Sequence, residues 1–148
     1  MKIMNINDII IPKLFRLTRP HSHKINRVKH YVKKYGKLDK PIVLYGNTLV
    51  DNYTRYIVAL SKGMEEISCV DIIDCFGTKD IYIQGKFEGC DKVYSWKLDK
   101  PIPITIGSKV IVEVKNTTDI VDVVGIYTAN RNSDYATKFV VDVYDGQT

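Results

Sequence analysis

The chain has 148 residues, of which 45% are hydrophobic and 26% are charged, a composition typical of soluble globular proteins. This length allows one ordinary domain or two small ones. No apolar run approaches the roughly 18 residues of a membrane-spanning helix, so we expect a soluble, cytoplasmic protein with no membrane partner.

The net charge of +5 is unevenly distributed along the chain. Residues 1–73 carry 13 Lys and Arg against 6 Asp and Glu, whereas residues 74–148 carry 9 against 11. The excess is greatest in residues 13–40, which hold 10 basic residues and one acid, Asp39. Such asymmetry predicts that the first half meets a nucleotide, a nucleic acid or an acidic protein surface. The alternative is a solvated face that keeps the protein soluble.

The first elements predict the start of a small α+β unit. Residues 6–11 read as a short strand that ends at Pro12. A helix is predicted from about residue 23 to 35, because its apolar residues repeat at three- and four-residue steps. Ser22 is a plausible N-cap for this helix, and Gly36 is a natural C-terminal cap.

A hairpin, a second helix and a strand follow. The apolar runs 41–45 and 49–51 predict two strands joined by a tight Gly-Asn turn. Residues 52–63 predict a short helix that ends at a glycine, and residues 66–73 predict another strand. The order strand, helix, hairpin, helix, strand completes the α+β unit within about 70 residues.

The second half has a different pattern. After a linker at residues 74–80, short β-rich runs are separated by clusters of Gly, Pro, Asn and Asp; they span 81–87, 92–98, 109–114, 119–128 and 138–145. Five short strands without a convincing helix indicate a small barrel or a rolled-up sheet. We therefore expect two domains, residues 1–74 and residues 79–148.

A polar cluster at residues 51–55 lies where a strand passes into a helix. A helix N-terminus has free backbone N–H groups and the positive end of the helix dipole, so it attracts anions. Arg55 can bind a phosphate with two parallel hydrogen bonds. Asp51 is a poor phosphate neighbour; it could cap the helix, bind a metal ion that accompanies phosphates, or orient Arg55. Alternatively, Asp51 or Asn52 is only an N-cap and Arg55 only a surface charge.

Residues 41–72, "PIVLYGNTLVDNYTRYIVALSKGMEEISCVDI", resemble the core of the ParB N-terminal and sulfiredoxin-like superfamily. There, a strand ending in "LVDG" or "LIDG" runs into Gly-x-x-Arg and a helix. Here Asn52 stands at the glycine and Arg55 at the arginine. The preceding order of strand, Arg-Pro, Lys, helix, Gly and apolar strand matches as well, so the resemblance covers about residues 5–73.

Members of this superfamily bind nucleotides at this turn. The resemblance implies a phosphate cradle formed by Asn52, Tyr53, Thr54 and Arg55, with Asp51 beside it and with Lys24 and Arg27 of the first helix facing the nucleotide. The sequence leaves the cofactor unknown, and a nucleoside triphosphate with Mg²⁺ is the candidate that the resemblance suggests. The function implied is a nucleotide- or nucleic-acid-binding regulatory module of ParB-like type from a bacterium or a phage.

Three departures from the family pattern reduce the number of reactions that we expect of this chain. Asn52 replaces the glycine, Tyr53 replaces the nucleophilic cysteine of sulfiredoxins, and Tyr53 with Thr54 replaces the histidines usual in the serine-kinase group. The partition proteins carry a further Glu-Asn-x-x-Arg segment and a helix-turn-helix domain, which this sequence lacks. We assign no catalytic residue, and no metal ligand because Asp51 alone does not make a metal cluster. The sequence leaves enzymatic activity undecided and favours a module without catalysis.

Basic residues of the first half are candidates for contacts to nucleic acid. These are Arg16, Arg19, Lys24, Arg27, Lys33 and Lys34. Two other functions remain open: an ATP-dependent kinase or ATPase that uses the same cradle, and a phage or mobile-element inhibitor that acts through its basic face.

Residues 80–146 resemble SH3-like small barrels through a Gly-Ser turn followed by the strand "KVIVEV". The aromatic residues Tyr82, Tyr94, Trp96 and Tyr127 could form a stacking platform for a base or for a proline of a partner. The alternative is that most of them fill a small core. The acidic balance of this half favours contact with a protein partner or self-association.

Overall fold

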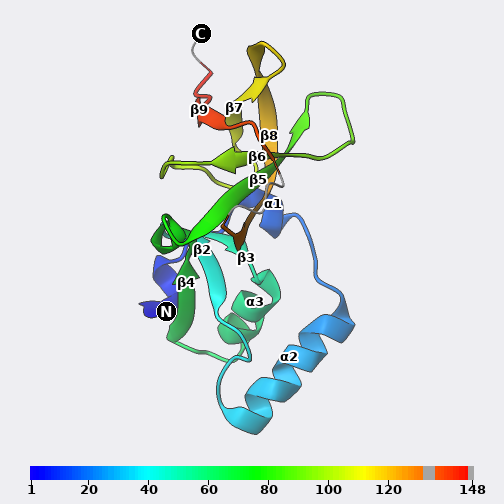
Figure 1. Ribbon diagram of the computed structural model, residues 1–148. Helices are drawn as coiled ribbons and strands as arrows, with labels where there is room; N and C mark the ends of the chain where they lie inside the picture. The colour runs from blue at the N-terminus through cyan, green and yellow to red at the C-terminus, as the bar shows by residue number, and fades with distance from the viewer. Residues whose placement is uncertain (132–135, 147–148) are drawn as a thin grey trace. The chain divides into compact units, whose positions relative to one another are not determined.

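The computed structural model describes residues 1–131 and 136–146. The chain divides into two compact units, Met1–Asp71 and a second unit that begins at Ile72. Each unit contains one β-sheet (Figure 1). The expected α+β class is confirmed for the described chain as a whole, which combines a few helices with two sheets.

The first unit is built on a four-stranded sheet with the strand order β1-β4-β2-β3. Its elements are β1 (Lys2–Asn5), the 3-10 helix η1 (Ile6–Asp8), α1 (Lys13–Arg16), α2 (Ser22–Tyr35), β2 (Ile42–Tyr45), β3 (Thr48–Asp51), α3 (Tyr53–Ser61) and β4 (Glu66–Asp71). β2 and β4 run parallel, and the other pairs are antiparallel. The parallel pair requires a long crossover connection, and α3 lies in that connection.

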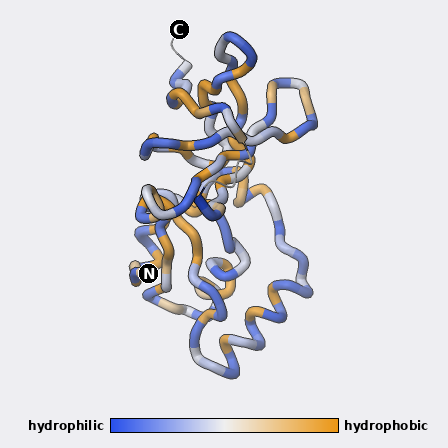
Figure 2. Tube along the Cα trace, in the orientation of Figure 1, coloured by the Kyte–Doolittle hydropathy of each residue, from blue (hydrophilic) through white to orange (hydrophobic). Residues whose placement is uncertain are grey.

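α3 packs on two different partners. Ala59 is fully buried in a cluster with Leu44 of the sheet, and its neighbour Val58 is buried against Val28 and Val32 of α2. α3 therefore lies between the sheet and α2. Burial of an aliphatic side chain contributes about 1.5–3 kcal/mol, so this small valine patch is a modest attachment for a helix as long as α2. Most of α2 is hydrophilic, with a few hydrophobic positions (Figure 2).

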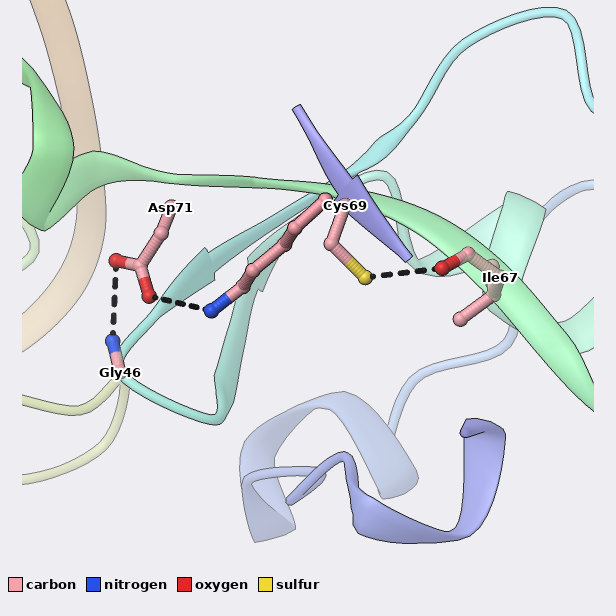
Figure 3. A network of polar contacts seen from close by, with 5 residues as sticks. Gly46, Ile67, Cys69 and Asp71 are labelled. Atoms are coloured by element: carbon pink, nitrogen blue, oxygen red, sulfur yellow. Dashed lines mark hydrogen bonds and ion pairs between the residues drawn. The ribbon is translucent and has the colours of Figure 1, made fainter. Parts of the chain in front are cut away.

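A buried carboxylate closes the hairpin against the end of β4. Asp71 accepts hydrogen bonds from the backbone N–H of Gly46 and from the Lys2 ammonium, each at 3.3 Å (Figure 3). Tyr45, next to the turn, is 5% exposed, and its hydroxyl finds no hydrogen-bond partner among the described residues. Burial, together with the nearby charge of Asp71, raises the pKa of Tyr45 to about 12.

The predicted strand at residues 6–11 is wrong. The chain forms β1 earlier, and Ile6–Asp8 turns into η1, because the Asn5 side chain accepts a hydrogen bond from the Asn7 backbone N–H at 2.9 Å. Only Ile10 reaches the sheet, through a bridge to Thr48. Ile9 and Ile11 are buried on either side of the exposed Ile10, so this segment packs on the core without forming a strand.

The predicted hairpin, second helix and last strand of this unit are confirmed as β2, β3, α3 and β4. The first helix is confirmed as α2, but Ser22 does not cap it. His21 occupies the N-cap position, and its carbonyl accepts the first helical bond from the Ile25 N–H at 3.1 Å. Gly36 ends the helix with a φ of 74°, as expected of a left-handed cap.

The second unit is a five-stranded sheet with the order β6-β5-β8-β7-β9. Its elements are the 3-10 helix η2 (Ile72–Cys75), β5 (Lys79–Phe87), β6 (Tyr94–Leu98), β7 (Lys109–Val114), β8 (Thr117–Asn130) and β9 (Val140–Val143). The five predicted β-rich runs are confirmed. The expected linker at residues 74–80 is wrong in part, because it contains the end of η2 and the first residues of β5.

The two outer strands of this sheet meet at one point. The Lys97 N–H in β6 donates a hydrogen bond of 2.8 Å to the Lys138 carbonyl, and Lys97 forms a bridge with Phe139. Fully buried side chains, including Tyr82 and Ile83, form the core. The SH3-like barrel and the domain limits at residues 74 and 79 stay predictions.

Candidate functional site

The start of α3 has an unusual backbone. Asn52, between β3 and α3, has a left-handed φ of 67°, which asparagine tolerates better than most residues. Its side-chain amide donates to the Pro41 carbonyl at 2.7 Å, and its backbone N–H donates to the Asp51 carboxylate at 2.7 Å. Since the amide is bonded to Pro41, no side chain caps the start of α3 in the part of the chain that the structure describes.

The start of α2 is also open. His21 is the N-cap, and no side-chain hydrogen bond satisfies the first turn within the described ranges. No acidic residue lies in the first turn of either helix. Both helices therefore present backbone N–H groups and the positive end of a helix dipole without a neutralising side chain in that turn.

The two helix starts line one hollow of about 290 Å³, which we call the α2–α3 hollow. Its walls are Phe15, Thr18, Arg19, Pro20, His21, Lys24, Asp51, Asn52, Tyr53 and Thr54. The structure thus brings together Arg19, Lys24 and the 51–54 part of the predicted turn. It leaves Arg27 and Arg55 outside the lining.

Cations outnumber carboxylates in this hollow. Arg19 and Lys24 are exposed, and neither takes part in an ion pair between described residues. Asp51 is the one acidic residue of the lining, and its carboxylate already accepts the Asn52 N–H. The hollow is therefore suited to an anion, with one carboxylate in its lining.

Aromatic rings form the apolar part of the lining. The ring centroids of Phe15 and Tyr53 lie 5.2 Å apart, and Tyr53 stacks on Tyr56 at 6.1 Å. The sequence had singled out Tyr53 but missed Phe15, Thr18 and His21. The dipeptide Pro20-His21 directly before the helix was an available signal, because residues beside a helix start lie close to its free N–H groups.

Arg55 has a different environment. It is 6% exposed, and its Nε and Nη2 donate to the two carboxylate oxygens of Asp39 at 3.1 and 2.9 Å. The hydrogen bond from Arg55 is the main reason why the pKa of Asp39 lies below its usual value. The interpretation of Arg55 as a mere surface charge is wrong, as is the pairing of Arg55 with Asp51, because Asp39 is the partner. Its role as a phosphate ligand stays a prediction.

The remaining candidate cations lie outside the hollow. Arg16, Arg27, Lys33 and Lys34 are all exposed, and the Lys34 ammonium lies 5.3 Å from the centre of the Tyr35 ring. Their role in nucleic-acid binding stays a prediction.

The aromatic residues of the second unit do not form one platform. Tyr82 is fully buried and stacks on Tyr127 at 5.4 Å. Trp96 is 4% exposed, and its indole N–H donates to the Glu113 carbonyl at 2.8 Å. Tyr94 is 41% exposed and contacts Trp96 at 6.2 Å. The core interpretation is therefore right for Tyr82 and Trp96.

No group of three or more His, Cys, Asp or Glu side chains is arranged to hold a metal ion among the residues that the structure describes. Within residues 1–131 and 136–146, no helix has both the length and the apolar character needed to cross a membrane.

A solved structure resembles part of the chain. It is a Pnob8-like ParB-N domain, which matches 47% of this chain and 28% of its own length, with 17% identity and a TM-score of 0.42. The chain thus covers little more than a quarter of that neighbour. No family model and no curated protein matches the chain. The neighbour falls in the superfamily that residues 5–73 resemble, and at this score it adds no argument about fold or function.

Proposed function

We propose that the first unit is a nucleotide-binding module and that the α2–α3 hollow receives the phosphates. The observation that carries the proposal is the convergence of two uncapped helix starts on one hollow that also contains Arg19 and Lys24. Helix N-termini bind phosphates through free N–H groups and the helix dipole. Arg and Lys side chains add charge-assisted hydrogen bonds.

The other residues of the hollow fit the rest of a nucleotide. Phe15 and Tyr53 offer ring surfaces, and stacking of a base on an aromatic ring contributes about 1–3 kcal/mol. A volume of about 290 Å³ is near the lower end of small-molecule sites, which suits the phosphates with part of the nucleoside. Asp51 would repel a bare phosphate, so we propose that Mg²⁺ lies between Asp51 and the phosphates.

The test is calorimetric titration with CTP, ATP and GTP, with and without Mg²⁺. Lys24→Ala is compared with Lys33→Ala, because both lysines are exposed on α2 and only Lys24 lines the hollow. We expect micromolar binding of at least one nucleotide that weakens about 10-fold in Lys24→Ala, the loss of one charge-assisted contact, and stays unchanged in Lys33→Ala. Absence of binding to every nucleotide would contradict the proposal.

A second candidate is nucleic acid bound along α2. It is favoured by the exposed cations Lys24, Arg27, Lys33 and Lys34, which belong to no ion pair of the described residues. Binding to phosphate backbones releases counterions, so affinity falls steeply with salt. On this proposal Lys24→Ala and Lys33→Ala weaken binding of a DNA duplex by similar factors, which separates it from nucleotide binding in the hollow.

A further inference from the structure

The loop that joins α2 to β2, residues 36–41, is attached to the first turns of α3 at two points. Asp39 pairs with Arg55 through two hydrogen bonds, and the Pro41 carbonyl accepts the Asn52 amide. The residue next to Asp39, Leu38, packs against both core clusters of the unit, that of the sheet and that of the α2–α3 valines. We call residues 36–41 the clamp loop.

The clamp loop helps to fix the position of α2 relative to α3. This helix is held to α3 by the small valine patch of Val28, Val32 and Val58 and by its two connections to the rest of the chain. A bidentate pair between a guanidinium and a carboxylate fixes the relative orientation of the two groups as well as the distance between them. Because Arg55 is in the first turn of α3, the Asp39 pair ties the connection of α2 directly to the helix start that lines the α2–α3 hollow.

We infer that Arg55 is a positioning residue, which acts through Asp39 to hold α2 against the start of α3 and so sets the shape of the α2–α3 hollow. The Nε and Nη2 atoms of Arg55 already donate to both carboxylate oxygens of Asp39, and Arg55 is absent from the lining of the hollow. This inference rests on the proposed function, since the hollow is the site that it serves.

The opposite role for Arg55 makes opposite predictions. If Arg55 contacted the phosphates, Asp39 would compete with them, and Asp39→Ala would free the guanidinium and raise or preserve affinity. If Arg55 is a positioning residue, Asp39→Ala and Arg55→Ala weaken nucleotide binding by similar factors. The double variant is then no weaker than either single one, because both changes break the same pair.

The experiment measures the affinity for CTP, ATP and GTP by calorimetry in Asp39→Ala, Arg55→Ala, the double variant and the exchanged pair Asp39→Arg with Arg55→Asp. All are measured at a temperature where circular dichroism shows each variant folded. We expect about 10-fold weakening in each single variant and recovery to within about 3-fold in the exchanged pair. A direct phosphate contact could not be recovered in that pair, because residue 55 would carry a carboxylate. The control is Asp39→Lys, measured at the same temperature. In this variant the ion pair is replaced by two cations, residue 39 and Arg55, that face each other.

A ligand-free measurement keeps the two proposals distinguishable. In Asp39→Ala, amide hydrogen exchange should accelerate in α2 and in the clamp loop, whereas the strands β2 and β4 keep their protection. If the wild-type chain binds no nucleotide but this acceleration occurs, the proposed function is contradicted, whereas the role of the Asp39–Arg55 pair in holding α2 is supported. Unchanged exchange, or unchanged affinity in Asp39→Ala beside a loss in Arg55→Ala, overturns the inference.

Discussion

The two units contain hollows whose linings are of opposite charge, and the hollow of the second unit is the larger of the pair. The α2–α3 hollow contains Arg19, His21 and Lys24 beside one carboxylate. In the second unit, a hollow of about 410 Å³, which we call the β7–β8 hollow, is lined by Phe87, Glu88, Lys109, Asp119, Ile120, Asp122 and Tyr144. There the one lysine of the lining is bonded to Asp122 at 2.8 Å. Volume alone therefore does not indicate a ligand, whereas the sign of the charged groups and their pairing do.

The origin of this difference is in the secondary structure. The cations of the α2–α3 hollow stand at helix starts, where free N–H groups add positive potential. The carboxylates of the β7–β8 hollow stand on and beside antiparallel strands, which have little net dipole. An anion is therefore attracted to the α2–α3 hollow by the backbone and the side chains together. The β7–β8 hollow has no such combined attraction for an anion.

The largest expected effect comes from making the first hollow resemble the second. In the double variant Arg19→Glu with Lys24→Glu, we expect nucleotide affinity to fall at least 100-fold, about 2.7 kcal/mol. The free energy of unfolding should change by no more than about 0.5 kcal/mol, because both side chains are exposed. Calorimetry and urea denaturation measure the two quantities.

The control for that experiment is Lys37→Glu with Lys62→Glu, which changes the net charge equally at exposed positions outside the hollow. It should retain affinity within about 3-fold. An equal loss in the control would mean that the general field of the protein, not the hollow, attracts the nucleotide.

The second test disturbs the second unit and leaves the first hollow alone. A Cβ at Gly85 would come 2.8 Å from Val121 Cγ2 and 3.1 Å from Trp96 Cζ3, so Gly85→Ala should lower the stability of this unit by about 1–3 kcal/mol through overpacking. Gly125→Ala is the matched control, because its close neighbour is the end of the flexible Gln84 side chain. Thermal unfolding followed by Trp96 fluorescence should show the larger loss in Gly85→Ala, with nucleotide affinity kept in both.

The third test lowers the pH to break the ion pair between Asp39 and Arg55 in the first unit. Arg55 holds the pKa of Asp39 below its usual 3.8, so the pair stabilises the folded state fully above pH 3.8. That contribution is lost as the pH falls through the lower, folded-state pKa. Asp39→Asn should therefore lower stability by about 1–2 kcal/mol at pH 7, with a smaller difference from wild type below pH 3. Equal differences at both pH values would contradict the pairing.

The smallest effect is expected at Tyr45, whose buried hydroxyl contrasts with the Arg55 guanidinium bonded to Asp39. Tyr45→Phe removes a polar atom that has no partner in the described chain, so the free energy of unfolding should rise or change by less than about 1 kcal/mol at pH 7. The pKa of Tyr45 is raised to about 12, so its contribution to stability is intact below pH 10 and is lost as the pH rises toward 12. The variant should lose less stability than wild type between those pH values.

Local patterns in the sequence were enough to predict most of the elements. The Gly-Asn turn between two apolar runs predicted the β2–β3 hairpin, and three- and four-residue spacing predicted α2. The error at residues 6–11 has a local cause, since the side chain of Asn5 competes with strand pairing by bonding the Asn7 N–H. Such competition is hard to weigh from sequence, because asparagine also occurs in strand ends.

The candidate site was predictable only in part. The turn at residues 51–54 could be found because it is next to a predicted helix start, whereas Lys24 was indicated by the resemblance and by the excess of basic residues around it. The environment of Arg55 could not be found, because its partner Asp39 is 16 residues away in a loop, and no spacing rule connects a loop residue to a helix. Pairs of this kind depend on the tertiary arrangement and not on local preference.

The pairing of β1 with β4 has a consequence for synthesis on the ribosome. Lys2 is opposite Cys69 in this pair, so the first strand of the unit finds its neighbour only after almost the whole unit has been made. At about 5–20 residues per second, β1 stays without its neighbour for several seconds. Ile3, 65% exposed even in the folded chain, lies in that strand. The first unit is therefore completed in one late step, and a chaperone that binds extended apolar segments has its best opportunity before that step.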